Sequence, residues 1–416
     1  MLKKFNIKKI CLLLFSITLS MPILQIHRIT LSLVLAICYL ILSICSNKFK
    51  FSLNKFSFLL IIFLFLAISN IFICFCSGMG FNWKFVCIFN VFLMIVALYF
   101  GLFETNKIVE KYLDTFINGI KIGCVFNLIW CCLQLIFFYI FHLDINDFLF
   151  NHILGIIQVA SAYRDGTTFC VTGLGWHPAQ LVPIIVISYC FFDNIWVRIG
   201  LVGISYFSHN TTCLISCLLC FCLSAILQKK IKVTKKTILY IFGFFLFAFV
   251  ILLMIPSVFL KVIGVIENTY QRFYTIVVLP EKADISSSLH ARYYTLLPSV
   301  FNKMNLFQKL FGIGYECSGY PYTILTGQYS VLNDWITESD YINLLVGRGV
   351  IWFFLFYIML IYIGKKGNKI SYKYSLYILI ILVCGILYNN QFWWVIILEF
   401  IMITSIKKGI DIWRLR

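Results

Sequence analysis

A polar stretch late in the chain collects side chains that could take part in bond chemistry. It separates an apolar run that ends near Ser257 from another that begins at Tyr341. Its charged residues include Arg272, Arg292, Glu316, Asp334, Glu338 and Asp340. A carboxylate can take the proton of an attacking hydroxyl, and an always-protonated arginine presents a planar fork of donors to phosphate oxygens. The stretch therefore holds side chains suited to proton transfer and to binding phosphate groups.

The composition indicates which elements must position these residues. Of the 416 residues, 62% are hydrophobic and 12% are charged, and the mean hydropathy is +0.95. A soluble domain cannot bury so much apolar surface, so lipid must be the solvent. The apolar runs are about twenty residues long, the length of a helix that crosses roughly 30 Å of hydrocarbon. The sequence thus predicts an all-α polytopic membrane protein, a single integral domain over residues 1–416 with about twelve transmembrane helices and one large periplasmic loop.

The expected spans follow from the positions of the apolar runs. They lie near residues 10–26, 29–46, 56–76, 84–103, 119–143, 178–193, 195–207, 210–228, 237–258, 341–363, 371–388 and 391–406. The basic start resembles a signal peptide, but a second span follows at once, which favours a retained anchor. The short run at 195–207 is typical of a half-span helix that lines a cavity.

The lysines predict the topology. They gather in short clusters between spans, at Lys3–Lys9, Lys48–Lys55, Lys229–Lys236, Lys365–Lys369 and Lys407–Lys408. Short basic loops mark the cytoplasmic side, and a cytoplasmic N-terminus places every cluster, the segment 104–121 and the C-terminus there. The outward segments are then 144–177 and the larger 259–340. The formal charge of +18 is thereby explained by topology, and no nucleic-acid partner is expected.

No metal or cofactor is expected. The chain has no Asp-x-Asp pair suited to a divalent ion and no Cys/His spacing of the zinc-site type. Most of the 17 cysteines fall inside apolar runs, where a free thiol behaves as a small hydrophobe. Cys170 and Cys317 fall in the two outward segments and could pair, although free thiols are the favoured interpretation.

Three short motifs in the second outward segment carry a resemblance. They are Ser288 to Arg292, Gly312-Ile-Gly314, and Glu338 placed before Tyr341 to Gly349. Their order and spacing resemble the O-antigen polymerase and ligase superfamily, the Wzy-like integral membrane glycosyltransferases. Members have a Ser-x-x-x-Arg element, then a Gly-x-Gly turn, then a polar residue before a Tyr-Leu-x-x-Leu-x-x-x-Gly helix.

The first outward segment adds a partial match with two departures. Arg164-Asp-Gly166 and Thr172-Gly173, followed by Pro178, are similar to the family's Arg-x-x-Gly…Pro segment. Cys170 stands where the family often has its arginine, and residues 208–211 read Ser-His-Asn-Thr where many relatives have Ser-Arg-Thr. Ligases commonly have histidine at the position of Glu338, so this glutamate favours a polymerase.

The resemblance implies a substrate and roles. The substrate is an oligosaccharide on polyprenyl pyrophosphate, lying in the membrane lipid, and a chain-length regulator protein is a candidate partner. Arg292 is the first choice for holding the pyrophosphate, with Arg164, Arg272 and Arg348 as further candidates. Glu338 is the preferred base and Asp340 the second. A single displacement of this kind inverts the anomeric centre. The implied location is a bacterial inner membrane.

Each candidate also has a structural interpretation. An arginine near a bilayer surface, such as Arg272, often binds lipid headgroups. Glu338 and Asp340 can cap the helix that starts at Tyr341, an effect of about 0.3–1 kcal/mol. Arg348 lies about two turns inside a predicted span, where an unpaired charge costs at least about 2.5–3.5 kcal/mol. We therefore expect it to face a water-filled cavity and to pair with Asp340 or the lipid phosphate.

Three functions remain open at the level of the sequence. A polymerase would join lipid-linked repeat units into a surface polysaccharide such as O-antigen or capsule. A ligase would move the finished chain onto a lipid A core. A flippase or other transporter would show charged and Gly/Pro-broken spans in both halves, whereas the polar residues here gather late and on one side. That asymmetry favours an enzyme.

Overall fold

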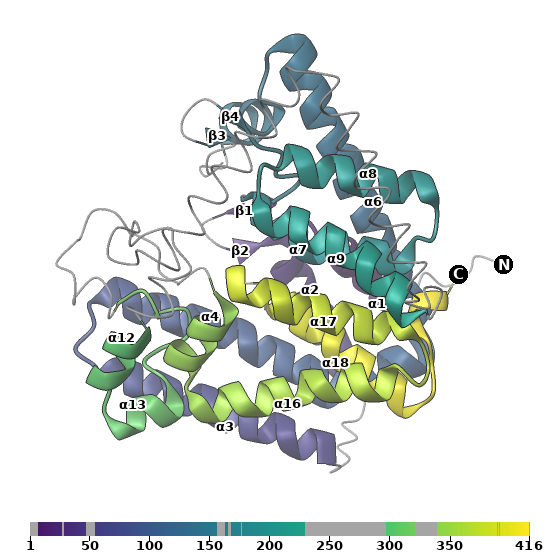
Figure 1. Ribbon diagram of the computed structural model, residues 1–416. Helices are drawn as coiled ribbons and strands as arrows, with labels where there is room; N and C mark the ends of the chain where they lie inside the picture. Colours follow the sequence, from purple (N-terminus) through teal and green to yellow (C-terminus); the bar gives the residue numbers. More distant parts are fainter. Residues whose placement is uncertain are drawn as a thin grey trace, which may run out of the picture.

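The computed structural model of the protein describes residues 7–26, 29–46, 55–155, 163–164, 168–175, 177–228, 297–320, 339–388, 390 and 392–415. Most of these residues are helical (Figure 1). Within the described ranges, three helical stretches are long and apolar enough to cross a membrane: Lys55–Cys76, Phe81–Phe141 and Val350–Gly367. Shorter apolar helices accompany them. The protein is therefore mostly helical, and its apolar helices are those of a membrane-embedded chain.

The N-terminal half contains long helices joined by short connections. In chain order these are α1 (Ile7–Thr18), β1 (Gln25–Ile26), β2 (Ile29–Thr30), α2 (Leu31–Ser46), α3 (Lys55–Cys76), α4 (Phe81–Tyr99), η1 (Phe100–Glu104), α5 (Thr105–Lys107), η2 (Ile108–Tyr112), α6 (Leu113–Phe141) and η3 (Asp147–Ile153). Strands β1 and β2 form an antiparallel pair. The span expected over 10–26 is thus a shorter helix, because the chain leaves the helix after Thr18 and enters this hairpin.

The remaining described elements include a second small hairpin and the helices that carry the late motifs. They are β3 (Tyr163–Arg164), β4 (Thr168–Phe169), η4 (Pro178–Gln180), α7 (Leu181–Phe191), α8 (Ile195–Phe207), α9 (Thr211–Leu227), α12 (Leu297–Lys303), α13 (Leu306–Phe311), α15 (Asp340–Ile342), η7 (Asn343–Arg348), α16 (Val350–Gly367), α17 (Tyr372–Leu387), α18 (Trp393–Lys407) and η8 (Ile412–Arg414). The two hairpins are additions to the all-α fold that the sequence predicts.

The segment between α4 and α6 differs from the expected loop over 104–121. The chain is helical throughout but changes direction within it. Phe100 and Phe116 both lie against Phe15, with ring centroids 5.3 and 6.3 Å from that ring. A straight helix would separate two residues sixteen positions apart by roughly 24 Å. The non-ideal backbone angles at Glu104 (φ −107°) and Tyr112 (φ −131°, ψ 11°) mark the places where the chain bends.

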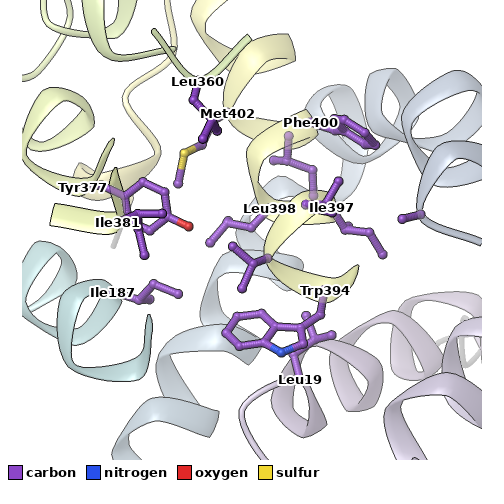
Figure 2. Packing of buried hydrophobic residues seen from close by; sticks show 14 of the residues in the cluster. Leu19, Ile187, Leu360, Tyr377, Ile381, Trp394, Ile397, Leu398, Phe400 and Met402 are labelled. Atoms are coloured by element: carbon purple, nitrogen blue, oxygen red, sulfur yellow. The ribbon is translucent and has the colours of Figure 1, made fainter. Parts of the chain in front are cut away.

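Helix α18 forms the centre of the bundle. Every residue from Trp394 to Ile406 is buried, which requires neighbours on all sides. Figure 2 shows Leu398 and Met402 on the side of Tyr377 and Leu360, which belong to α17 and α16, and Phe400 on the opposite side. A helix that is buried on all sides has no lipid-facing or water-facing stripe.

The two ends of the bundle have different chemistry. At one end, Lys8 and Lys408 reach Glu104 and Glu110, at 3.8 and 2.7 Å. Both the start of α1 and the end of α18 therefore lie against the bend between α4 and α6. At the other end, α13 packs on α3 and α16 (Figure 1), and the late motifs follow it. The motif end is thus opposite the end where the first and last long helices meet.

Candidate functional site

The expected Gly-x-Gly turn exists because two backbone segments touch there. After α13, the N–H of Ile313 donates to the carbonyl of Val346 (3.0 Å) and that of Gly314 to the carbonyl of Gly347 (3.1 Å). A Cβ on Gly312, which has φ +82°, would lie 2.2 Å from the Gly347 oxygen. No side chain fits into that space, so the glycine allows the contact. The structure thus brings together two of the motifs named by the resemblance.

Asn70 of α3 fastens the two segments. Its Nδ2 donates to the carbonyls of Phe311 (2.7 Å) and Gly347 (2.9 Å), and its Oδ1 accepts from the N–H of Tyr315 (2.8 Å). The side chain is fully buried. A buried amide with these partners fixes the positions of the segments it joins. The sequence analysis missed Asn70 because its partners lie more than 240 positions away along the chain.

Arg348 forms an ion pair with Glu316 across this contact. Its Nη2 lies 2.9 Å from Oε1 of Glu316, and Asn343 Nδ2 donates to the other carboxylate oxygen at 2.8 Å. The guanidinium carbon lies 4.7 Å from the ring centroid of Tyr315 and 5.7 Å from that of Trp352. Arg348 is only 4% exposed. Glu316 has φ +57°, a strained conformation for a residue with a side chain.

This arrangement corrects the expected partner of Arg348. The sequence analysis offered Asp340 or a lipid phosphate as its partner, and the protein side chain with which it forms an ion pair is Glu316 rather than Asp340. Asp340 and Arg348 occupy opposite ends of the α15–η7 stretch, roughly 12 Å apart along a helix axis, so they do not meet. Within the described residues, Nε and Nη1 of Arg348 have no hydrogen-bond partner. Three N–H donors on this buried cation, one on Nε and two on Nη1, thus have no acceptor among the described residues.

Asp340 lies beside the end of α17. It is 1% exposed, and its Oδ1 accepts from the N–H of Asn390 at 2.9 Å. A Cβ on Gly385 would lie 2.9 Å from its other carboxylate oxygen, so that glycine leaves room for the carboxylate. Ser339 and Tyr341 donate to carbonyls of α17 on either side. The residue predicted as a base is therefore a buried carboxylate in a close-fitting site.

The first outward segment reaches the same region. The ring of His177 stacks on Tyr388, with centroids 5.5 Å apart and planes 8° from parallel. Tyr388 in turn accepts from the side chain of Asn390, whose backbone donates to Asp340. Nδ1 of His177 accepts from the N–H of Ala179, which leaves the proton of the neutral ring on Nε2. The two outward segments therefore converge near Asp340.

Amide side chains hold the Thr172–Gly173 turn of the first outward segment. Gly173 donates to Oε1 of Gln134 at 2.7 Å, and Asn146 Nδ2 donates both to the carbonyl of Gly173 and to Thr172, each at 3.0 Å. Asn127 accepts from the residue that follows Gly173. Cys170, which stands where the family often has arginine, is buried. The turn is fixed by its contacts with α6 and with Asn146, which precedes η3.

Several site residues predicted from the sequence lie outside the described part of the chain. Arg272, Arg292 and Glu338 are not among the described residues, and Arg164 is described only as part of β3. The structure therefore details Arg348 and Asp340, and adds Glu316, Asn343 and Asn390. Glu316 lies two residues after the last glycine of the Gly-x-Gly turn, which is the signal that could have singled it out.

The described residues also lack a grouping of three or more histidine, cysteine or carboxylate side chains arranged for a metal ion. No protein-family model matches the chain, and no curated protein matches it in sequence.

Proposed function

We propose that the protein is a polymerase that joins polyprenyl-pyrophosphate-linked oligosaccharide repeat units into a surface polysaccharide. The transfer would invert the anomeric centre at the periplasmic face of a bacterial inner membrane. The observation that supports the proposal is the direct contact between residues 312–316 and 341–349. These segments carry two of the three motifs of the resemblance, and they meet around a buried ion pair at one end of the bundle.

The leaving group is pyrophosphate, so the site must stabilise growing negative charge. In the proposal, Arg292 holds the pyrophosphate, with Arg164 and Arg272 beside it. Arg348 contributes through Nε and Nη1, the donors that Glu316 does not use. Charge-assisted hydrogen bonds of this type are worth about 1.5–3 kcal/mol each, and membrane lipid reduces the screening around them.

The incoming sugar hydroxyl needs a base. Glu338 takes that role in the proposal, because Asp340 is buried and bound by the backbone of Asn390. Asp340, two residues after Glu338, then acts as a positioning residue. It accepts from the backbone of Asn390, just beyond α17, while Ser339 and Tyr341 on either side of it donate to carbonyls of α17.

A genetic experiment tests the function. A strain that lacks the gene is complemented with the wild type, Arg292→Ala, Glu338→Gln or the control Arg414→Ala, at matched membrane levels. Arg414 is 79% exposed at the end of the bundle away from the motifs. The surface polysaccharide is then separated by gel electrophoresis. We expect long chains with the wild type and the control, and only single repeat units with the other two variants.

The other possible outcomes distinguish the alternative functions. Long chains in both Arg292→Ala and Glu338→Gln would remove these residues from the mechanism. Long polymer that accumulates on the polyprenyl carrier would identify a ligase. Unpolymerised units trapped on the inner leaflet would identify a transporter.

A further inference from the structure

Three cysteine thiols from distant parts of the chain meet beside the candidate site. Cys74 belongs to α3, Cys87 to α4, and Cys317 to the turn that follows Glu316. Each is fully buried, and each thiol is close enough to the other two to influence it electrostatically. This cluster is independent of the proposed polymerase chemistry, which uses none of its members.

The backbone around the cluster is shaped to bring two of the sulfurs together. Gly314 has φ +152°, and a Cβ placed on it would lie 3.2 Å from the Sγ of Cys317 and 3.2 Å from the Sγ of Cys74. Both sulfurs therefore flank the same glycine. The thiol of Cys317 also donates to the carbonyls of Trp83 and Tyr315, at 3.5 and 3.3 Å. These contacts fix the direction in which the Cys317 side chain points.

We propose that Cys317 and Cys74 form a disulfide bond that fastens the Glu316 turn to helix α3. A disulfide requires two sulfurs that can approach each other closely, and the shared contact with Gly314 makes the sulfurs of Cys74 and Cys317 neighbours. The sequence analysis considered Cys170 as the partner of Cys317, but Cys317 lies against Cys74 and Cys87 instead.

The bond forms by thiol–disulfide exchange with a dithiol oxidase of the extracytoplasmic compartment. One thiolate attacks the oxidase disulfide and gives a mixed disulfide. The second thiolate displaces the oxidase sulfur, so the protein loses two electrons and two protons and the oxidase is reduced to its dithiol. Because the thiols are buried in the folded chain, the exchange takes place while residues 312–317 dock. Cys87, whose thiol donates to Oδ1 of Asn70 at 3.6 Å, remains a free thiol.

Mass spectrometry tests the assignment. The full chain is produced in a bacterium with a periplasmic dithiol oxidase, quenched in acid, alkylated under denaturing conditions and digested without reductant. We expect a cross-linked peptide that joins Cys74 to Cys317. It should persist in Cys87→Ser and in the control Cys222→Ser, whose side chain is exposed on α9, and disappear in Cys74→Ser and Cys317→Ser.

A second measurement uses the folded protein in detergent. Dithiothreitol should lower the unfolding temperature of the wild type and leave that of Cys317→Ser unchanged. Three alkylated thiols in the wild type would overturn the proposal, and so would a cross-link that joins Cys87 to either neighbour. An equal effect of dithiothreitol on the wild type and Cys317→Ser would contradict it as well.

Discussion

The ion pair of Arg348 and Glu316 shows how a charge is kept inside an apolar bundle. A lone arginine at this depth would cost at least about 2.5–3.5 kcal/mol. Here Glu316 neutralises the charge, Asn343 satisfies the second carboxylate oxygen, and the rings of Tyr315 and Trp352 lie against the guanidinium. Such a pair contributes little net stability compared with apolar residues, but loss of one partner leaves the other charge buried and unpaired.

Glu316→Gln is expected to destabilise the fold strongly for this reason. The substitution keeps the shape and removes the countercharge, so the free energy of unfolding should fall by about 3 kcal/mol. The matched control is Glu110→Gln, because Glu110 pairs with Lys408 at 2.7 Å in an exposed position and should change stability by less than about 1 kcal/mol. Unfolding of both variants in detergent is the measurement. An equal loss of unfolding free energy in the two variants would show that burial of the Arg348–Glu316 pair does not cause the destabilisation.

The burial of Asp144 predicts that the stability of the fold depends on pH. Burial raises the pKa of this carboxyl, which lies just beyond α6, although the N–H groups of Asn146 and Asp147 partly offset the shift. The folded state then holds the proton more tightly than the unfolded chain. Stability is therefore lost as the pH rises above about 4, the ordinary pKa of the group.

Asp144→Asn keeps an oxygen that can accept both N–H groups and removes the charge. It should raise the unfolding temperature at pH 7 and have little effect near pH 4. Thermal unfolding of the wild type and variant at the two pH values gives the comparison. A variant less stable than the wild type at pH 7 would contradict the raised pKa of Asp144.

At the scale of elements, Gly349 divides what hydropathy predicts as one span over 341–363. Its φ of +90° ends η7, and α16 starts after it. A Cβ there would lie 2.4 Å from the carbonyl oxygen of Leu310 and 2.5 Å from the nitrogen of Gly312. The break is therefore set by the turn that packs against it, which a local apolar pattern does not contain.

Gly349→Ala should be poorly tolerated. The backbone strain alone costs about 1–3 kcal/mol, and the contact with Leu310 adds to it. Gly200→Ala is the matched control, since Gly200 lies in α8 with no atom near its Cβ position, and alanine should stabilise that helix by about 0.5–1 kcal/mol. Size-exclusion chromatography in detergent measures the folded fraction. Equal folded fractions for the two variants would contradict the interlocked turn.

Hydropathy predicted the helix boundaries well where packing against other segments does not shift them. The expected 56–76 and 371–388 correspond to α3 (Lys55–Cys76) and α17 (Tyr372–Leu387). It was wrong where packing sets the ends, as at Gly349. The candidate site was likewise predictable where a local motif marks it and not where distant contacts build it. The Gly-x-Gly turn could be found from its motif, but Asn70 could not, because its partners are distant in the sequence and nothing local marks it.

At the scale of the whole molecule, the lysine clusters predict one topology. The first and last long helices meet at one end of the bundle, and α12 and α13 lie at the other (Figure 1). A cytoplasmic N-terminus therefore places Lys366 inside and Lys303 outside.

Lys303→Cys and Lys366→Cys test this arrangement, since both side chains are exposed. A membrane-impermeant maleimide on intact cells should label the first variant above the wild-type background and the second only after permeabilisation. The reverse pattern would place the late motifs in the cytoplasm.

Reconstitution tests the central claim most directly. Purified protein in liposomes is supplied with the lipid-linked repeat unit extracted from the producing strain, and the products are separated by size. The wild type should convert single units into a ladder of lipid-linked oligomers, and Glu338→Gln should not. Transbilayer movement of single units without any joining by the folded wild type would contradict the account.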